Sequence, residues 1–153
     1  MIDAPTILDT TAQHAAVIHL TIPRARIQAE MGPAMQEVMT TVASMGVKPT
    51  GPMFSHHFRM SPETFDLEVG VPVAAPITAS GRVKPSTLPA AHIARTIYHG
   101  GYEGLGAAWG EFNSWVKKNG HTMADNLWES YLRGPESGPD ASAWQTQLNR
   151  PIR

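Results

Sequence analysis

The two halves of the chain repeat one pattern of apolar residues and glycine. Apolar residues three and four positions apart share one face of a helix, and glycine is common just after a helix end. The matched positions, at identical spacings, are Met35, Val38, Val42, Gly46, Phe54, Ser55 and His57 in the first half, and Trp109, Phe112, Val116, Gly120, Trp128, Glu129 and Tyr131 in the second. The repeat predicts an α+β fold of two β-α-β-β modules related by a pseudo-twofold axis, with one antiparallel sheet, two helices on one face and a ligand cleft between them.

Local patterns place the individual elements. Residues 1–14 are polar and acidic, and they are expected to form a frayed leader before a domain spanning 15–153. One helix is expected from about Gly32 and Pro33 to Gly46, and a second between the Gly100-Gly101-Tyr102 turn and Gly120. A turn is expected at 61–63, and a connector rich in Gly, Pro, Ser and Thr at 76–89, which could carry a short strand near 82–84. Alternating apolar and polar residues predict strands at 15–22, 53–60, 65–73, 92–99, 127–132 and 143–149.

The composition excludes several classes of protein. Charged residues make up 16% of the 153 residues, below the usual ~25%, and the formal net charge is −1. This charge gives no electrostatic footprint for nucleic acid or an anionic membrane. The chain has no cysteine, which excludes disulfides, thiol nucleophiles and thiolate metal sites. No apolar run approaches a membrane span, and no signal peptide is present, so a cytoplasmic protein without direct DNA or membrane binding is expected.

Glu129 is the most informative polar residue. It lies in the strand Leu127-Trp128-Glu129-Ser130-Tyr131-Leu132, where alternation places Glu129 and Tyr131 on one face. A carboxylate among large aromatic side chains is costly unless it is paired, protonated or available to a cationic partner. Glu129 could therefore anchor a flat cation, act as a general acid or base with Tyr131, or form an ordinary salt bridge on an exposed strand.

Further candidates surround this strand in the predicted fold. Tyr102 precedes the second helix and could form a cleft wall or simply pack the helix entry. Trp109 is favoured over Trp115 as a groove residue, because Trp115 lies off the apolar stripe. In the first half, the predicted ligand-binding residues are Met39, Phe54 and His57, with core filling or exposure as the alternatives.

Other chemistries find no support. The seven histidines form no HExxH motif, and His56 and His57 are adjacent in a strand, so they point to opposite faces. The sequence has neither a GxSxG elbow nor a GxxxxGK[ST] loop. No cofactor and no metal are therefore predicted.

Five segments together resemble one known family. They are GPMFSHHF at 51–58, DLEVGVPV at 66–73, GGYEGLGAAWGEFNSWVKKNG at 100–120, WESYL at 128–132, and the closing stretch from Trp144 to Ile152. In this order they are similar to the GyrI-like small-molecule-binding family, also called the bacterial transcription activator effector-binding domain. One departure is the Gly-Gly before Tyr102, where many members have Gly-Pro.

The resemblance implies a cleft for flat, apolar, often cationic molecules, with Glu129 as the central ligand-contacting acid. Members fused to a helix-turn-helix domain are multidrug-responsive regulators, and this chain resembles a standalone member. Some standalone members hydrolyse cyclopropane-containing alkylators, whereas others inhibit gyrase. The expected function is capture or sensing of an aromatic or cationic small molecule by a monomer or homodimer. The alternatives are a hydrolase that uses Glu129 to activate water, and a protein that binds gyrase or a separate regulator.

Overall fold

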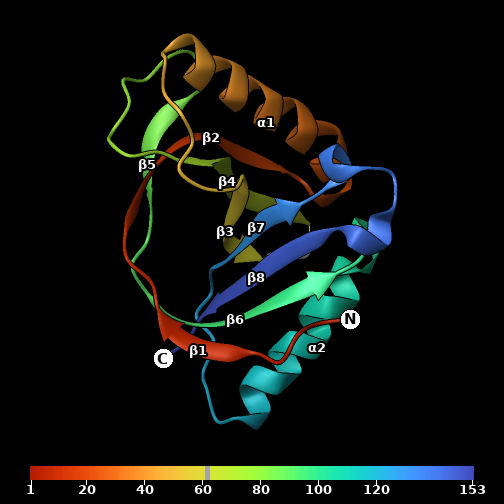
Figure 1. Ribbon diagram of the computed structural model, residues 1–153. Helices are drawn as coiled ribbons and strands as arrows, with labels where there is room; N and C mark the ends of the chain where they lie inside the picture. The colour runs from red at the N-terminus through yellow and green to blue at the C-terminus, as the bar shows by residue number, and fades with distance from the viewer. Residues whose placement is uncertain (61–62) are drawn as a thin grey trace. The chain divides into compact units, whose positions relative to one another are not determined.

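The computed structural model describes residues 1–60 and 63–153, apart from the side chains of Gln28, Met60 and Glu136. The chain divides into two compact units, which are coloured along the sequence in Figure 1. The α1 unit comprises Thr11–Ala90, and the α2 unit comprises Met1–Thr10 with Ala91–Arg153. The turn expected at 61–63 lies largely outside the described residues.

The α1 unit is a four-stranded antiparallel sheet with one long helix. Within it the strand order is β3-β4-β2-β5. The helix packs Ala34, Val38 and Val42 against one face of β2 and β4, burying a core of small and branched apolar residues. The elements are β2 (Gln13–Pro23), η1 (Arg24–Arg26), α1 (Ile27–Ser44), β3 (Phe54–Met60), β4 (Thr64–Pro72) and β5 (Lys84–Leu88).

The α2 unit repeats this plan. Its strand order is β1-β6-β8-β7, again antiparallel throughout. The helix α2 buries Ala108, Phe112 and Val116 in a separate core with residues of β6 and β8. The elements are β1 (Thr6–Asp9), β6 (His92–His99), η2 (Tyr102–Gly104), α2 (Leu105–Lys118), β7 (Leu127–Arg133), η3 (Pro135–Ser137), η4 (Ala141–Ala143) and β8 (Gln145–Pro151).

The α+β fold and the duplicated β-α-β-β module are confirmed. Each module adds one outer strand, β5 in the α1 unit and β1 in the α2 unit. The repeat extends to a detail that the sequence did not suggest, since the second strand of each β-α-β-β module shifts register at a matched place. The shift lies between His57 and Arg59 in β3, and between Tyr131 and Arg133 in β7. A bulge bends and twists a strand, so the two modules share a local backbone feature as well as a topology.

Three local predictions were wrong. Residues before 15 are not frayed, because Thr6–Asp9 forms β1 and pairs with β6. The first helix begins at Ile27 and contains Pro33, although proline lacks the N–H that an interior position normally uses. Ile27 and Met31, which precede the proline, pack on the core of the unit, and this burial favours the longer helix. The last strand begins at Gln145 rather than 143, because η4 occupies Ala141–Ala143.

Candidate functional site

Glu129 accepts two hydrogen bonds from aromatic side chains of its own unit. The indole Nε1 of Trp109, on α2, donates to Glu129 Oε2 at 2.6 Å. The hydroxyl of Tyr131, two residues along β7, donates to Glu129 Oε1 at 2.8 Å. Strand alternation places Glu129 and Tyr131 on the face that α2 covers, and helical spacing turns Trp109 towards the same face as Phe112. The carboxylate is therefore fixed between a helix and a sheet.

This carboxylate is buried, and both of its donors are neutral. Glu129 is only 9% exposed. Burial raises the pKa of the Glu129 carboxyl, while the hydrogen bonds from Trp109 and Tyr131 act in the opposite direction. Among the described residues of the α2 unit, no Lys, Arg or His side chain forms an ion pair with it. The predicted alternative, a salt bridge on an exposed strand, does not fit this burial.

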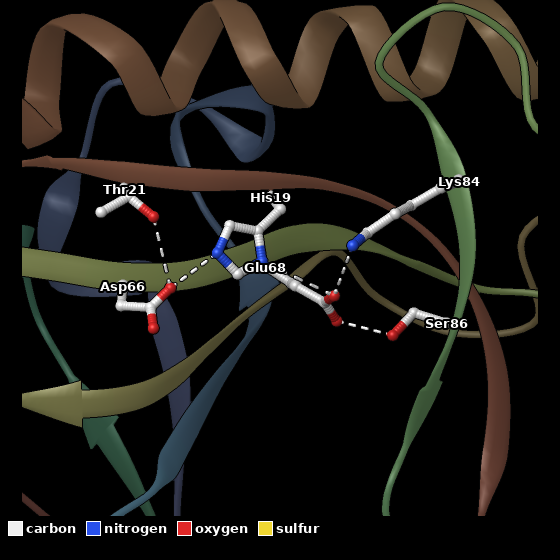
Figure 2. A network of polar contacts seen from close by, with 6 residues as sticks. All are labelled: His19, Thr21, Asp66, Glu68, Lys84 and Ser86. Atoms are coloured by element: carbon white, nitrogen blue, oxygen red, sulfur yellow. Dashed lines mark hydrogen bonds and ion pairs between the residues drawn. The ribbon is translucent and has the colours of Figure 1, made fainter.

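A second buried acid in the chain, Glu68, is paired with a cationic side chain and a hydroxyl. Glu68 of β4 is 7% exposed, similar to Glu129. Figure 2 shows its carboxylate between Lys84 and Ser86 of β5, with Lys84 Nζ at 3.7 Å and the Ser86 hydroxyl at 2.6 Å. His19 lies beside it, 4.0 Å from Glu68 Oε2, and pairs with Asp66 at 2.6 Å. Glu68 is thus part of a structural network with a cation, whereas the donors to Glu129 among the described residues, Trp109 and Tyr131, are neutral.

Aromatic rings extend the site beyond the acid. Tyr102, in η2, meets the Tyr131 ring edge-on at 6.0 Å between centroids. Trp144 also contacts Tyr102, with 5.2 Å between the two ring centroids. Tyr102 is 37% exposed, so this part of the group reaches the surface. The structure therefore brings together four predicted residues, Glu129, Tyr131, Trp109 and Tyr102.

Sequence reasoning missed Trp144. It lies outside the repeat and comes directly after η4, where no helical or strand pattern assigns its direction. Its position is fixed by a hydrogen bond from its indole Nε1 to the carbonyl of Gly138, at 3.1 Å. The only available signal was its large aromatic ring near a proline-rich loop, and that signal does not identify a contact with Tyr102.

The remaining predicted residues belong to the α1 unit. Met39 packs partly buried on the core of that unit, and Phe54 is 2% exposed. His57 is buried, and its ring meets Phe65 edge-on at 5.3 Å. Burial, with smaller contributions from His56 and Arg24, lowers the pKa of His57 to about 4. The exposed alternative for His57 is thus wrong, while a ligand contact for these three residues stays a prediction.

Among the described residues, no group of three or more His, Asp or Glu side chains could hold a metal ion. No helix in the described part of the chain is long and apolar enough to cross a membrane.

Comparison with known proteins gives one family and several related folds. The family model described as "GyrI-like small molecule binding domain" matches residues 3–148. No curated protein sequence matches the chain. The crystal structure of the EcmrR C-terminal domain is similar, with a TM-score of 0.85 at 19% identity, covering 98% of this chain and 97% of that one. In an EcmrR–DNA complex, the chain spans 57% of the length of EcmrR, with a TM-score of 0.84 at 18% identity and 98% of this chain covered.

Two other solved structures share the fold at lower similarity. SAV2435 bound to tetraphenylphosphonium has a TM-score of 0.66 at 9% identity, covering 99% of this chain and 94% of that one. A structure described as a hydrolase from Listeria innocua has a TM-score of 0.64 at 11% identity, covering 97% of this chain and 91% of that one. At these identities the likeness establishes the fold, and the chemistry has to be argued from the residues of this chain.

Proposed function

Because the chain belongs to the GyrI-like small-molecule-binding domain family, we propose that it binds amphipathic aromatic cations, with the Glu129 carboxylate as the electrostatic anchor. The observation that carries the proposal is a buried acid whose two hydrogen-bond donors, Trp109 and Tyr131, are both neutral. Neutral donors stabilise an ionised carboxylate without cancelling its charge. A cation next to Glu129 would therefore remove much of the cost of burying that charge.

The aromatic rings near Glu129 provide the second contribution to recognition of a cation. The faces of Trp and Tyr rings attract cations, and this attraction strengthens where water is excluded. Tyr102, Tyr131 and Trp144 form a continuous group, with centroids 6.0 and 5.2 Å apart, beside the acid. A flat or multiply arylated cation could contact these rings while its charge faces Glu129. The relative SAV2435 was crystallised with tetraphenylphosphonium, a cation of this class.

Two ions of nearly the same shape and opposite charge test the proposal. Tetraphenylphosphonium and tetraphenylborate would be titrated separately against the protein, following the fluorescence of its four tryptophans and confirming the results by calorimetry. We expect the phosphonium to bind and the borate to bind at least tenfold more weakly. Equal affinity for the two ions would show that burial of apolar surface, rather than the charge of Glu129, drives binding.

The matched variant is Glu129→Gln. An amide can still accept from Trp109 through its oxygen and donate to the Tyr131 hydroxyl through its nitrogen, so the local hydrogen bonds survive. Removing one charge of a buried pair typically costs about 2–5 kcal/mol, which is more than a tenfold loss of affinity for the phosphonium. Unchanged phosphonium binding by a folded Glu129→Gln protein would refute the role of the acid.

A hydrolase that uses the same residues is the second candidate. Burial raises the pKa of the Glu129 carboxyl, which brings it closer to the range in which a general acid or base works at neutral pH. Tyr131, bonded to Glu129 at 2.8 Å, could help to position a water molecule for attack on an electrophilic carbon, as in a cyclopropanoid substrate. Turnover of such a substrate that falls far more than its affinity in Glu129→Gln would favour this reading. A protein that acts only through a partner such as gyrase would show neither change.

A further inference from the structure

Thr146 has a buried hydroxyl that no described residue satisfies, and in the α2-unit sheet it lies opposite Tyr131, on the strand next to that of Glu129. The residue is 0% exposed, and its Oγ1 has no hydrogen-bond partner among the described residues. Leaving a buried hydroxyl unpaired destabilises the folded protein, whereas valine has nearly the same shape without that cost. A threonine at such a position therefore calls for an explanation.

Strand register places this hydroxyl within the candidate site. Thr146 of β8 lies directly opposite Tyr98 on one side and Tyr131 on the other. Residues directly opposite in a sheet point to the same face, so Thr146 shares the α2-covered face with Tyr131 and Glu129. Its neighbour two positions along β8, Leu148, is opposite Glu129. Thr146 and Glu129 are thus diagonal neighbours, a relation that typically separates residues by about 7–8 Å.

The tyrosines next to Thr146 already use their hydroxyl protons in other hydrogen bonds. The Tyr98 hydroxyl donates to the carbonyl of Gly101 at 2.9 Å, and the Tyr131 hydroxyl donates to Glu129 at 2.8 Å. Each of these protons is already used where it lies. Thr146 Oγ1 therefore remains an acceptor on the same sheet face as the carboxylate.

We propose that Thr146 is a specificity-determining residue, which makes the site prefer cations that carry N–H groups over cations that carry none. The inference rests on the proposed function. A protonated amine or amidine can donate one N–H to the Glu129 carboxylate and another to Thr146 Oγ1. A quaternary ammonium or phosphonium ion can satisfy the charge of Glu129, but it leaves the Thr146 hydroxyl unpaired.

Two cations that differ only at nitrogen provide the test. (1-Naphthylmethyl)ammonium carries three N–H donors, and its N,N,N-trimethyl analogue has the same ring and charge with none. We expect the wild-type protein to bind the N–H form about tenfold more tightly, the equivalent of one net hydrogen bond. In Thr146→Val we expect this ratio to fall severalfold, because the bond to Thr146 Oγ1 is lost while the N–H bond to Glu129 remains. Thr146→Ser, which keeps the hydroxyl, should retain most of the preference.

The outcomes separate this inference from the function on which it rests. If Thr146 has only a structural role, Thr146→Val will raise the melting temperature and leave the ratio at its wild-type value, which overturns the inference alone. If neither cation binds the wild-type protein, and tetraphenylphosphonium does not bind either, the proposed function fails as well. Glu129→Gln should weaken both naphthyl cations, and a loss confined to the N–H form would contradict the division of roles between the two residues.

Discussion

Replacing Trp109 with phenylalanine should destabilise the protein by an amount that grows with pH. The change removes the indole donor to Glu129 Oε2, at 2.6 Å, and keeps an aromatic ring beside Phe112, whose centroid lies 5.7 Å from that of Trp109. The lost hydrogen bond is worth more when its acceptor is ionised. A hydrogen bond to a charged group contributes about 1.5–3 kcal/mol, against about 0.5–1.5 kcal/mol between neutral groups.

The direction in which the pKa of Glu129 is shifted determines that this destabilisation rises with pH. Burial raises the pKa of folded Glu129 above its ordinary value of 4.5, so the folded protein holds this proton more tightly than the unfolded chain. The contribution of Glu129 to stability is therefore fully present below pH 4.5 and is lost as pH rises through the folded-state pKa. The Trp109 donor opposes that shift, so its removal raises the pKa further and deepens the loss. The extra destabilisation of the variant should increase by about 1–1.5 kcal/mol between acidic and neutral pH.

Urea unfolding followed by circular dichroism, at a series of pH values from 4 to 8, measures this difference. Trp115→Phe is the matched control, because Trp115 lies on the same helix, is also partly buried on the α2-unit core and makes no contact with Glu129 among those observed. We expect the free-energy difference between wild type and Trp115→Phe to stay constant with pH. A Trp109→Phe difference that is equally constant would refute the reasoning, because it would mean that the indole does not stabilise an ionised carboxylate.

Two further predictions follow from the same unit. Tyr131→Phe removes the other donor to Glu129, so the midpoint of tetraphenylphosphonium binding against pH should move to higher pH, and superimposable pH profiles would contradict this. Gly104→Ala should lower the free energy of unfolding by about 1–3 kcal/mol, because the new Cβ would meet the Tyr98 hydroxyl. Gly110→Ala should raise the free energy of unfolding by about 0.5–1 kcal/mol, because Gly110 lies in α2 with open space around it. Urea midpoints of the two alanine variants that move in the same direction would contradict the second prediction.

The module was predictable because its apolar spacing repeats. Val38 and Val42 in one half, and Phe112 and Val116 in the other, are buried as their helical spacing indicates. The strand assignments for 92–99 and 127–132 agree with the structure to within a residue, because alternation is visible within a single segment. These features depend on local sequence, and local sequence carries enough information for them.

Features that depend on distant partners were not predictable. Strand β1 pairs with β6, more than 80 residues away, and its residues are mostly exposed, so no alternation marks it. The bulges in β3 and β7 likewise arise from register with a partner strand. Thr146 was missed for the same reason, because only the pairing of β8 with β6 and β7 shows that it lies between two tyrosines.

The candidate site likewise contains features that local sequence predicts and features that depend on distant partners. Glu129 and Tyr131 could be placed on one face from their spacing alone. The hydrogen bond from Trp109 required the approach of α2 to β7, which the apolar stripe only suggested. The rotation of the Trp144 indole depends on the carbonyl of Gly138, a backbone group in a loop whose path no residue pattern defines.

The pKa of the Glu129 carboxyl, with and without a bound cation, tests the central claim most directly. The protein would be labelled with ¹³C at glutamate side chains, with Glu129→Gln used to assign its signal, and titrated in the absence and in the presence of saturating tetraphenylphosphonium. The account predicts a pKa above the usual glutamate value in the free protein and a clear decrease when the cation is bound, because a neighbouring positive charge favours the ionised form. A pKa that the bound cation leaves unchanged would show that the cation binds away from Glu129 and would contradict the account.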